Sequence, residues 1–249
     1  MKRRRRYAVL SVPGAAQQSV SWQAESVQPM TVSEELFEKL CRNSQVRFEP
    51  IPAADGVRTA DYKVWLNTVE AIVEVKQIKE GNHERNLLAT AENDEAPAVA
   101  SDVHIRIRKK FQKARKQLKN LSGGFLPTLF VLYDNTNGLS GLDNEDFLQA
   151  MHGNEVLEIY STKSGKPPKV VGTFHTFDSG SSKVREYLNT SVSCFCRLLA
   201  NKDGNPMLYV FHNEFAANPL STDLAKLIAN KQFVRPKTER NEYRNWMPI

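Results

Sequence analysis

The stretch DYKVWLNTVEAIVEVKQIK, residues 61–79, decides how this chain folds. Two alternating segments, 61–66 and 69–78, flank the dipeptide Asn67-Thr68. Asparagine tolerates the positive φ that a two-residue hairpin turn requires. The pattern therefore predicts an antiparallel β-hairpin with these two residues in the turn.

The predicted pairing gives the hairpin one apolar face and one charged face. With this turn, Tyr62 pairs with Val73, and Asp61 pairs with Glu74. The apolar face then carries seven side chains: Tyr62, Val64, Leu66, Val69, Ala71, Val73 and Val75. The other face brings Asp61 and Glu74 together with Lys76. Directly opposed residues lie about 5 Å apart, where like charges repel, so we expect a cation to bind between the two carboxylates.

The composition is that of one globular domain in a reducing compartment. The chain has 249 residues, of which 41% are hydrophobic and 25% charged, and no apolar run approaches 18 residues, so we expect no membrane span. The apolar stretch that follows the basic residues 2–6 is too short for an export signal. An odd number of cysteines without metal-type spacing favours a cytoplasmic location.

A long basic helix is predicted after the hairpin. Its apolar stripe recurs at helical spacing and consists of Val103, Ile107, Phe111, Ala114, Leu118 and Leu121. Eight basic residues and no acidic one surround this stripe. Such a concentration favours a polyanion, and the expected nucleic-acid contacts are Arg106, Lys109, Lys110, Lys113 and Lys116. The alternative interpretation is a solvated helix face.

The remaining elements complete an α/β pattern. A helix is expected from Thr31 to about Arg42, followed by a strand at 46–51. Residues 80–101 indicate a functional loop, and 134–146 a polar, turn-rich segment. Strands are predicted at 126–133, 155–161, 170–175, 191–199 and 207–212, with a helix at 223–230. We expect a basic flexible extension at 1–30, a single domain at 31–230 and a polar tail at 231–249.

Four pieces of the chain, taken together, resemble the restriction-endonuclease-like or PD-(D/E)xK nucleases. They are an acidic helix at 33–38, Ala60-Asp61-Tyr62 opening a strand, Glu74-Val75-Lys76-Gln77 on the next strand, and a helix with Ala114-x-x-Gln117. The resemblance covers roughly residues 31–133. It implies a restriction-endonuclease-like core, a mixed β-sheet flanked by helices, to which this chain adds C-terminal strands. Ala60 stands where the motif often has proline, a residue that ligates nothing.

The resemblance also implies a metal-dependent nuclease that hydrolyses phosphodiester bonds, with DNA as the expected substrate. Asp61 and Glu74 would hold Mg²⁺ or Mn²⁺, and the Val75 carbonyl would complete the protein ligands. Lys76 would stabilise the scissile phosphate or position the attacking water. No membrane partner is expected, and both a monomer and a homodimer are compatible with the sequence.

The third carboxylate is expected from the first helix. The predicted buried stripe of that helix consists of Leu36, Phe37, Leu40 and Cys41. On a wheel of 100° per residue, Glu34 lies about 90° from the centre of the stripe, Glu38 about 130° and Glu35 about 170°. Glu34 is therefore the candidate site residue, and its structural alternative is a capping box with Thr31.

Two other functions fit the same residues. The domain could hold nucleic acid or a partner protein without cutting it, in which case binding depends on salt and no metal-dependent turnover occurs. It could also be a structural α/β protein in which Asp61 and Glu74 pair with Lys63 and Lys76. Chelation would then leave the melting temperature unchanged.

Overall fold

The computed structural model describes residues 30–52, 59–79, 103–135, 143–152, 154–160, 169–176, 189–236 and 247–249. The chain divides into two compact units, Met1–Met30 and Thr31–Ile249, and the fold below is that of the second. The predicted N-terminal extension, apart from Met30, and the loop predicted at 80–101 lie outside the described residues.

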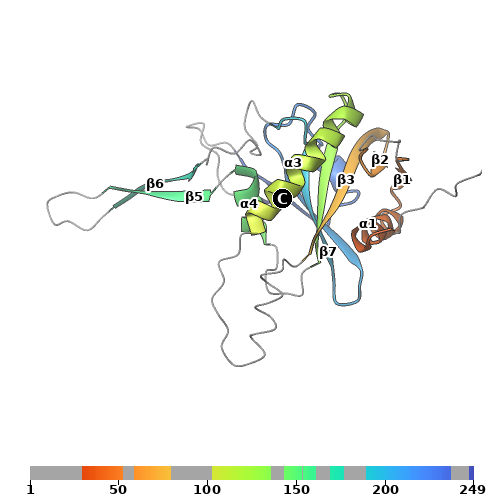
Figure 1. Cartoon of the computed structure of the whole chain (residues 1–249), viewed down its shortest axis with the longest axis horizontal. Coiled ribbons are helices and arrows are strands. Elements are labelled where there is room, and N and C mark those ends of the chain that lie inside the picture. The colour runs from red at the N-terminus through yellow and green to blue at the C-terminus, as the bar shows by residue number, and fades with distance from the viewer. Residues whose placement is uncertain are drawn as a thin grey trace, which may run out of the picture. The chain divides into compact units, whose positions relative to one another are not determined.

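The fold is mixed α/β, built on an eight-stranded sheet with the order β1-β2-β3-β4-β7-β8-β9-β10 (Figure 1). Its strands are β1 (Arg47–Pro50), β2 (Tyr62–Leu66), β3 (Val69–Lys79), β4 (Thr128–Asn135), β7 (Cys194–Ala200), β8 (Pro206–His212), β9 (Lys231–Val234) and β10 (Met247–Pro248). A separate two-stranded antiparallel sheet consists of β5 (Asn154–Tyr160) and β6 (Lys169–Thr176). The predicted mixed sheet with additional C-terminal strands is confirmed.

The predicted hairpin forms, and its register is the predicted one from Tyr62 to Leu66. The predicted direct pair of Asp61 with Glu74 is not formed, because Asp61 precedes β2 and its backbone N–H donates to the Val73 carbonyl instead. Tyr62 pairs with Val73 and Leu66 with Val69, and Asn67 adopts a φ of 56° in the turn. The expected apolar face is buried, except that Val69 is half-buried. After β3, the chain crosses over through a helix and returns as β4, parallel to β3, as a parallel pair requires.

Helices cover both faces of the sheet. One face packs against α1 (Val32–Asn43) and the short α5 (Thr222–Ala225), and the other against α3 (Val103–Ser122) and α4 (Asn144–His152). In Figure 1, α3 crosses in front of the sheet. Strand residues alternate between the two apolar layers, with Val73 and Val75 facing α1, and Ile72 and Ile78 facing α3.

Local sequence features set the start of α1 and the end of α3. Thr31 caps α1, and its side chain and that of Glu34 form a reciprocal capping box. The helix α3 stops at Ser122 because Gly123 and Gly124 adopt φ angles of 58° and 78°, a left-handed conformation that glycine enters at low cost.

Three expectations about the C-terminal half were wrong. The segment 134–146, expected to be polar and turn-rich, ends inside the helix α4, which the burial of Phe147 and Met151 stabilises. The helix expected at 223–230 is only the four-residue α5. The predicted tail begins too early, because residues 231–234 form β9 and pair in parallel with β8.

Within the described residues, no helix is both long and apolar enough to cross a membrane.

Candidate metal and phosphate site

The hairpin register brings the end of one strand next to the middle of another. Asp61 directly precedes β2, and its backbone N–H donates to the Val73 carbonyl at 3.1 Å. The Val75 N–H donates to Oδ2 of Asp61 at 2.7 Å. The Asp61 carboxylate therefore accepts the N–H of Val75, where a backbone carbonyl would accept it if β2 extended further toward the N-terminus. This bond fixes the carboxylate against β3.

Lys76 joins the two carboxylates. Its Nζ lies 2.5 Å from Oε1 of Glu74 and 3.4 Å from Oδ2 of Asp61. The structure thus brings together the three side chains that the hairpin pattern placed on one face. Lys63 does not join them, because it pairs with Glu70 at 3.0 Å.

Burial makes this cluster electrostatically unusual. The Glu74 side chain is fully buried, whereas Asp61 and Lys76 are 19% and 28% exposed. Burial, followed by repulsion from Asp61, raises the pKa of Glu74 to about 7. Burial also raises the pKa of Asp61. For Lys76, burial lowers the pKa, but attraction by the two carboxylates outweighs this effect and the net pKa is raised.

The two oxygens of the Glu74 carboxylate differ in their contacts. Oε1 lies 2.5 Å from Nζ of Lys76, whereas Oε2 makes no hydrogen bond in the described part of the chain. A buried oxygen of this kind carries a desolvation cost unless a donor or a cation binds it. It is therefore suited to bind a cation.

The donor set fits a hard cation with a small number of protein ligands. Asp61 and Glu74 supply carboxylates, and ions such as Mg²⁺ prefer oxygen and retain several waters. Among the described residues, no group of three or more His, Cys, Asp or Glu side chains could hold a metal ion. A backbone carbonyl could supply a third protein oxygen.

The Val75 carbonyl points to the side required for that role. In a β-strand, the N–H and C=O of one residue point to the same side. The N–H of Val75 reaches Asp61, whereas the N–H of Ile72 points the other way, to the Pro127 carbonyl just before β4. The Val75 carbonyl is therefore directed toward the side on which Asp61 lies.

Among the described residues, no hydrogen bond or ion pair joins Glu34 to this cluster. Its Oε2 accepts a hydrogen bond from the Thr31 N–H at 2.6 Å, so the capping box, its structural alternative, is formed. Glu34 still acts through its charge, because it raises the pKa of both Asp61 and Glu74.

The predicted orientation of α1 was wrong in one respect. Glu38 is buried rather than turned away from the sheet, and its Oε1 accepts from the Tyr62 hydroxyl at 3.2 Å. Leu36 is only half-buried, whereas Ser33 is buried. The buried stripe is rotated by roughly 30° from its predicted centre. The hydrogen bond to Tyr62 and an ion pair with Arg42 compensate for burying the Glu38 carboxylate.

The helix α3 packs on the face of the sheet opposite α1, and it supports the backbone near Asp61. Its predicted buried positions Ile107, Phe111, Ala114 and Leu118 are all buried, and the side chain of Val103 lies outside the described residues. Gln117 Nε2 donates to the Thr59 carbonyl at 2.6 Å. This bond holds the backbone two residues before Asp61, a role that sequence reasoning did not assign.

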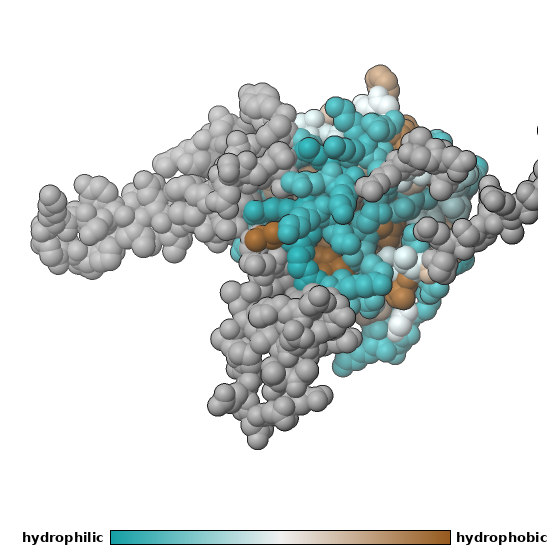
Figure 2. All heavy atoms as spheres, in the orientation of Figure 1, coloured by the Kyte–Doolittle hydropathy of each residue, from teal (hydrophilic) through white to brown (hydrophobic). Residues whose placement is uncertain are grey.

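A basic hollow adjoins the carboxylate cluster. It has a volume of about 490 Å³ and is lined by Gln77, Ile78, Lys79, Arg106, Lys109, Lys110 and Lys113. Figure 2 shows that the surface over α3 is mainly hydrophilic. Lys109, Lys113 and Lys116 are exposed, as predicted. Lys79 and Gln77 were missed as lining residues, although their position just after Lys76 on β3 could have indicated them.

The cations around this hollow lie close enough to affect one another. Burial, followed by repulsion from Lys113, Lys76 and other cations, lowers the pKa of Lys110. Lys76 therefore contacts the carboxylates and also acts electrostatically on Lys110, which lines the hollow. A bound anion would relieve the repulsion at Lys110.

Comparisons with protein-family models, with curated proteins and with solved structures find no match for this chain.

Proposed function

We propose that this chain is a metal-dependent nuclease that hydrolyses phosphodiester bonds, with DNA as the expected substrate. The observation that carries the proposal is the position of the Lys76 ammonium, which lies between the carboxylates of Asp61 and Glu74 and beside the basic hollow. Cation-binding oxygens and phosphate-binding nitrogens thus lie next to each other.

Each residue has a distinct role in this proposal. Asp61, Glu74 and the Val75 carbonyl would hold Mg²⁺ or Mn²⁺, which supplies charge neutralisation at the scissile phosphate and a water of lowered pKa. Because Lys76 is 28% exposed, its ammonium can reach a phosphate at the surface. It would donate to a phosphate oxygen or position the attacking water. The charge of Glu34 would favour a bound cation from a distance.

The order of the elements supports a restriction-endonuclease-like core. The helix α1, the strands β2 and β3 and the helix α3 follow one another as the resemblance requires, with Asp61 opening β2 and Glu74 on β3. The helices α1 and α3 lie on opposite faces of the sheet.

A polyanionic substrate is supported by the charge of α3. The lysines at 109, 110 and 113 line a hollow large enough for a stretch of phosphate backbone. Contacts of this kind dominate the affinity for nucleic acid and make it depend on salt. We assign Arg106, Lys109, Lys110, Lys113 and Lys116 to substrate binding.

Cleavage assays test the proposal directly. Supercoiled plasmid and labelled single- and double-stranded oligonucleotides are incubated with the full chain and Mg²⁺ or Mn²⁺. Glu74→Gln and Lys76→Met should each abolish cleavage without loss of folding. The matched controls are Glu70→Gln and Lys63→Met, since that Lys–Glu pair lies on the same hairpin at 3.0 Å. Cleavage by Glu74→Gln or Lys76→Met at the wild-type rate would refute the proposed site.

One observation favours a second function, nucleic-acid binding without cleavage. Within the described part of the chain, two acidic side chains contact Lys76, which already neutralises part of their charge. A binding module should show salt-dependent affinity that is unchanged by EDTA, and no turnover with either metal.

A further inference from the structure

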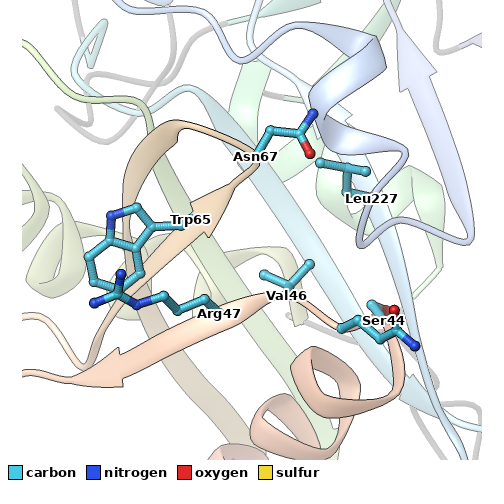
Figure 3. A pocket seen from close by; sticks show the side chains of 7 residues that line it. Ser44, Val46, Arg47, Trp65, Asn67 and Leu227 are labelled. Atoms are coloured by element: carbon cyan, nitrogen blue, oxygen red, sulfur yellow. The ribbon is translucent and has the colours of Figure 1, made fainter.

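A second hollow lies at the turn of the β2–β3 hairpin, at the opposite end of β2 from Asp61 (Figure 3). Its volume is about 280 Å³, and its lining includes Gln45, Arg47, Trp65 and Asn67. These residues come from the end of α1, from β1 and from the hairpin. None of them belongs to the proposed nuclease site.

A stacked cation–aromatic pair forms one end of the hollow. Arg47 and Trp65 are directly paired on β1 and β2, and Cζ of Arg47 lies 4.2 Å from the centroid of the Trp65 ring. Figure 3 shows the guanidinium lying against the indole. Glu49 contacts Nη2 of Arg47 at 2.5 Å, which helps to orient the guanidinium. Flat heteroaromatic rings stack on indole rings and on guanidinium planes.

Two residues with amide side chains belong to the lining. Gln45 and Asn67 have φ angles of 55° and 56°, and they are two of the three non-glycine residues with positive φ in the described chain. Gln45 follows the C-cap Ser44 of α1, where glycine fits at least cost. The chain has glutamine at this lining position despite the unfavourable backbone conformation. Residues held in such conformations concentrate at functional sites.

The rest of the lining limits the chemistry of the ligand. The lining also includes Val46 and Leu227, which pack in the apolar layer on the α1 face of the sheet, and no carboxylate lines the hollow among the described residues. Each amide can donate and accept a hydrogen bond, so together they suit a ring edge that carries both kinds of group. The volume lies just below the range of roughly 300–1,000 Å³ that is typical of pockets for drug-sized ligands, so the ligand is small.

We propose that this hollow binds a single nucleobase. The flat face of the base stacks on the Arg47–Trp65 pair, and its polar edge meets the amides of Gln45 and Asn67. The base can belong to a free nucleotide or to a nucleic-acid strand, and the chemistry of recognition is the same. This inference does not rest on the proposed cleavage, because it concerns the other end of the hairpin.

The fluorescence of Trp65 provides a direct measurement. The chain has three tryptophans, and Trp22→Phe with Trp246→Phe leaves Trp65 as the only indole. Glu74→Gln is added and EDTA is present, so that no strand is cut. AMP, UMP, a six-nucleotide DNA and an abasic DNA of the same length are titrated separately. We expect a ligand with bases to quench Trp65 saturably and the abasic strand to leave it unchanged.

Two substitutions separate binding from structure. Arg47→Met removes half of the stacked pair, and Gln45→Gly removes one amide while relieving the positive φ. Each should weaken base binding roughly fivefold or more, the scale of a lost stacking or edge contact. Gln45→Gly should not lower the melting temperature. Arg42→Met is the control, since it removes a cation at 5.7 Å from the Phe48 ring outside the hollow.

The outcomes distinguish the sources of the base. Quenching by AMP or UMP indicates a free nucleotide, and quenching by the six-nucleotide DNA alone indicates a base within a strand. Both results support the proposal. The proposal is overturned if no ligand quenches Trp65 at millimolar concentration, if the abasic strand quenches it equally, or if Gln45→Gly binds like the parent protein.

Discussion

The backbone N–H of Val75 donates a 2.7 Å hydrogen bond to the carboxylate of Asp61. In this bond a side-chain oxygen takes the role of a backbone carbonyl, just before the first residue of β2. As a result, Asp61 is placed by the register of the hairpin and not by a flexible loop. The same register places Lys76 against it at 3.4 Å.

Glu74→Gln should stabilise the protein at pH 8 while abolishing cleavage. The raised pKa of Glu74 means that its buried charge is unfavourable in the folded state, and glutamine resembles the neutral acid in size. Chemical denaturation at pH 8 in EDTA should show a higher free energy of unfolding for Glu74→Gln than for the wild-type protein. Glu70→Gln, at a partly exposed pair, should change that free energy by less than about 1 kcal/mol. A marked destabilisation by Glu74→Gln would mean that the ionised carboxylate supports the fold.

The stability of the metal-free protein should fall as pH rises from about 4.5 to about 7. In this interval the unfolded chain has already released the Glu74 proton, whereas the folded chain, with its pKa of about 7, still holds it. The unfolded state then binds fewer protons, so the free energy of unfolding decreases with pH. The raised pKa of Asp61 acts in the same direction.

Thermal unfolding in EDTA across this pH range measures the effect. The difference between the wild-type protein and Glu74→Gln isolates Glu74 from other titrating groups. That difference should be small at pH 4 and grow toward pH 8. If it is constant with pH, the pKa of Glu74 is not raised in the folded state.

Replacing two exposed lysines of α3 should weaken nucleic-acid binding without affecting stability. Lys109→Gln with Lys113→Gln removes two cations from the basic hollow, and the slope of log affinity against log salt should become shallower by about one to two. The free energy of unfolding should change by less than about 0.5 kcal/mol. Lys202→Gln with Lys226→Gln removes the same charge from other exposed positions and should have a smaller effect. Equal effects of the two pairs would indicate attraction by net charge alone.

Glu34→Gln should require about two- to threefold more Mg²⁺ for half-maximal cleavage, because Glu34 acts on the site through its charge. Glutamine also forms a capping box, so stability should change by less than about 1 kcal/mol. Glu35→Gln makes the same charge change on the exposed face of α1 and serves as control. If Glu38→Gln is inactive and Glu34→Gln is normal, the third functional carboxylate is the one that contacts Tyr62.

The sequence by itself determined the hairpin and the long helix. A turn of two residues separates β2 from β3, so the alternation of side chains fixes the register and brings Asp61, Glu74 and Lys76 together. The stripe of α3 has a helical period over twenty residues, which fixes its buried face. Both signals are local, because each element carries its own pattern.

Only the tertiary structure decided where separate elements meet. The rotation of α1 depends on packing against the sheet, which buries Glu38 beside Tyr62 and leaves Glu34 in its cap. The strand β9 is four residues long, too short to show a period, and its pairing with β8 stabilises it. The hollow beside Trp65 is lined by both Arg47 and Leu227, which are far apart in the chain. Such contacts depend on long-range packing, which a local pattern does not specify.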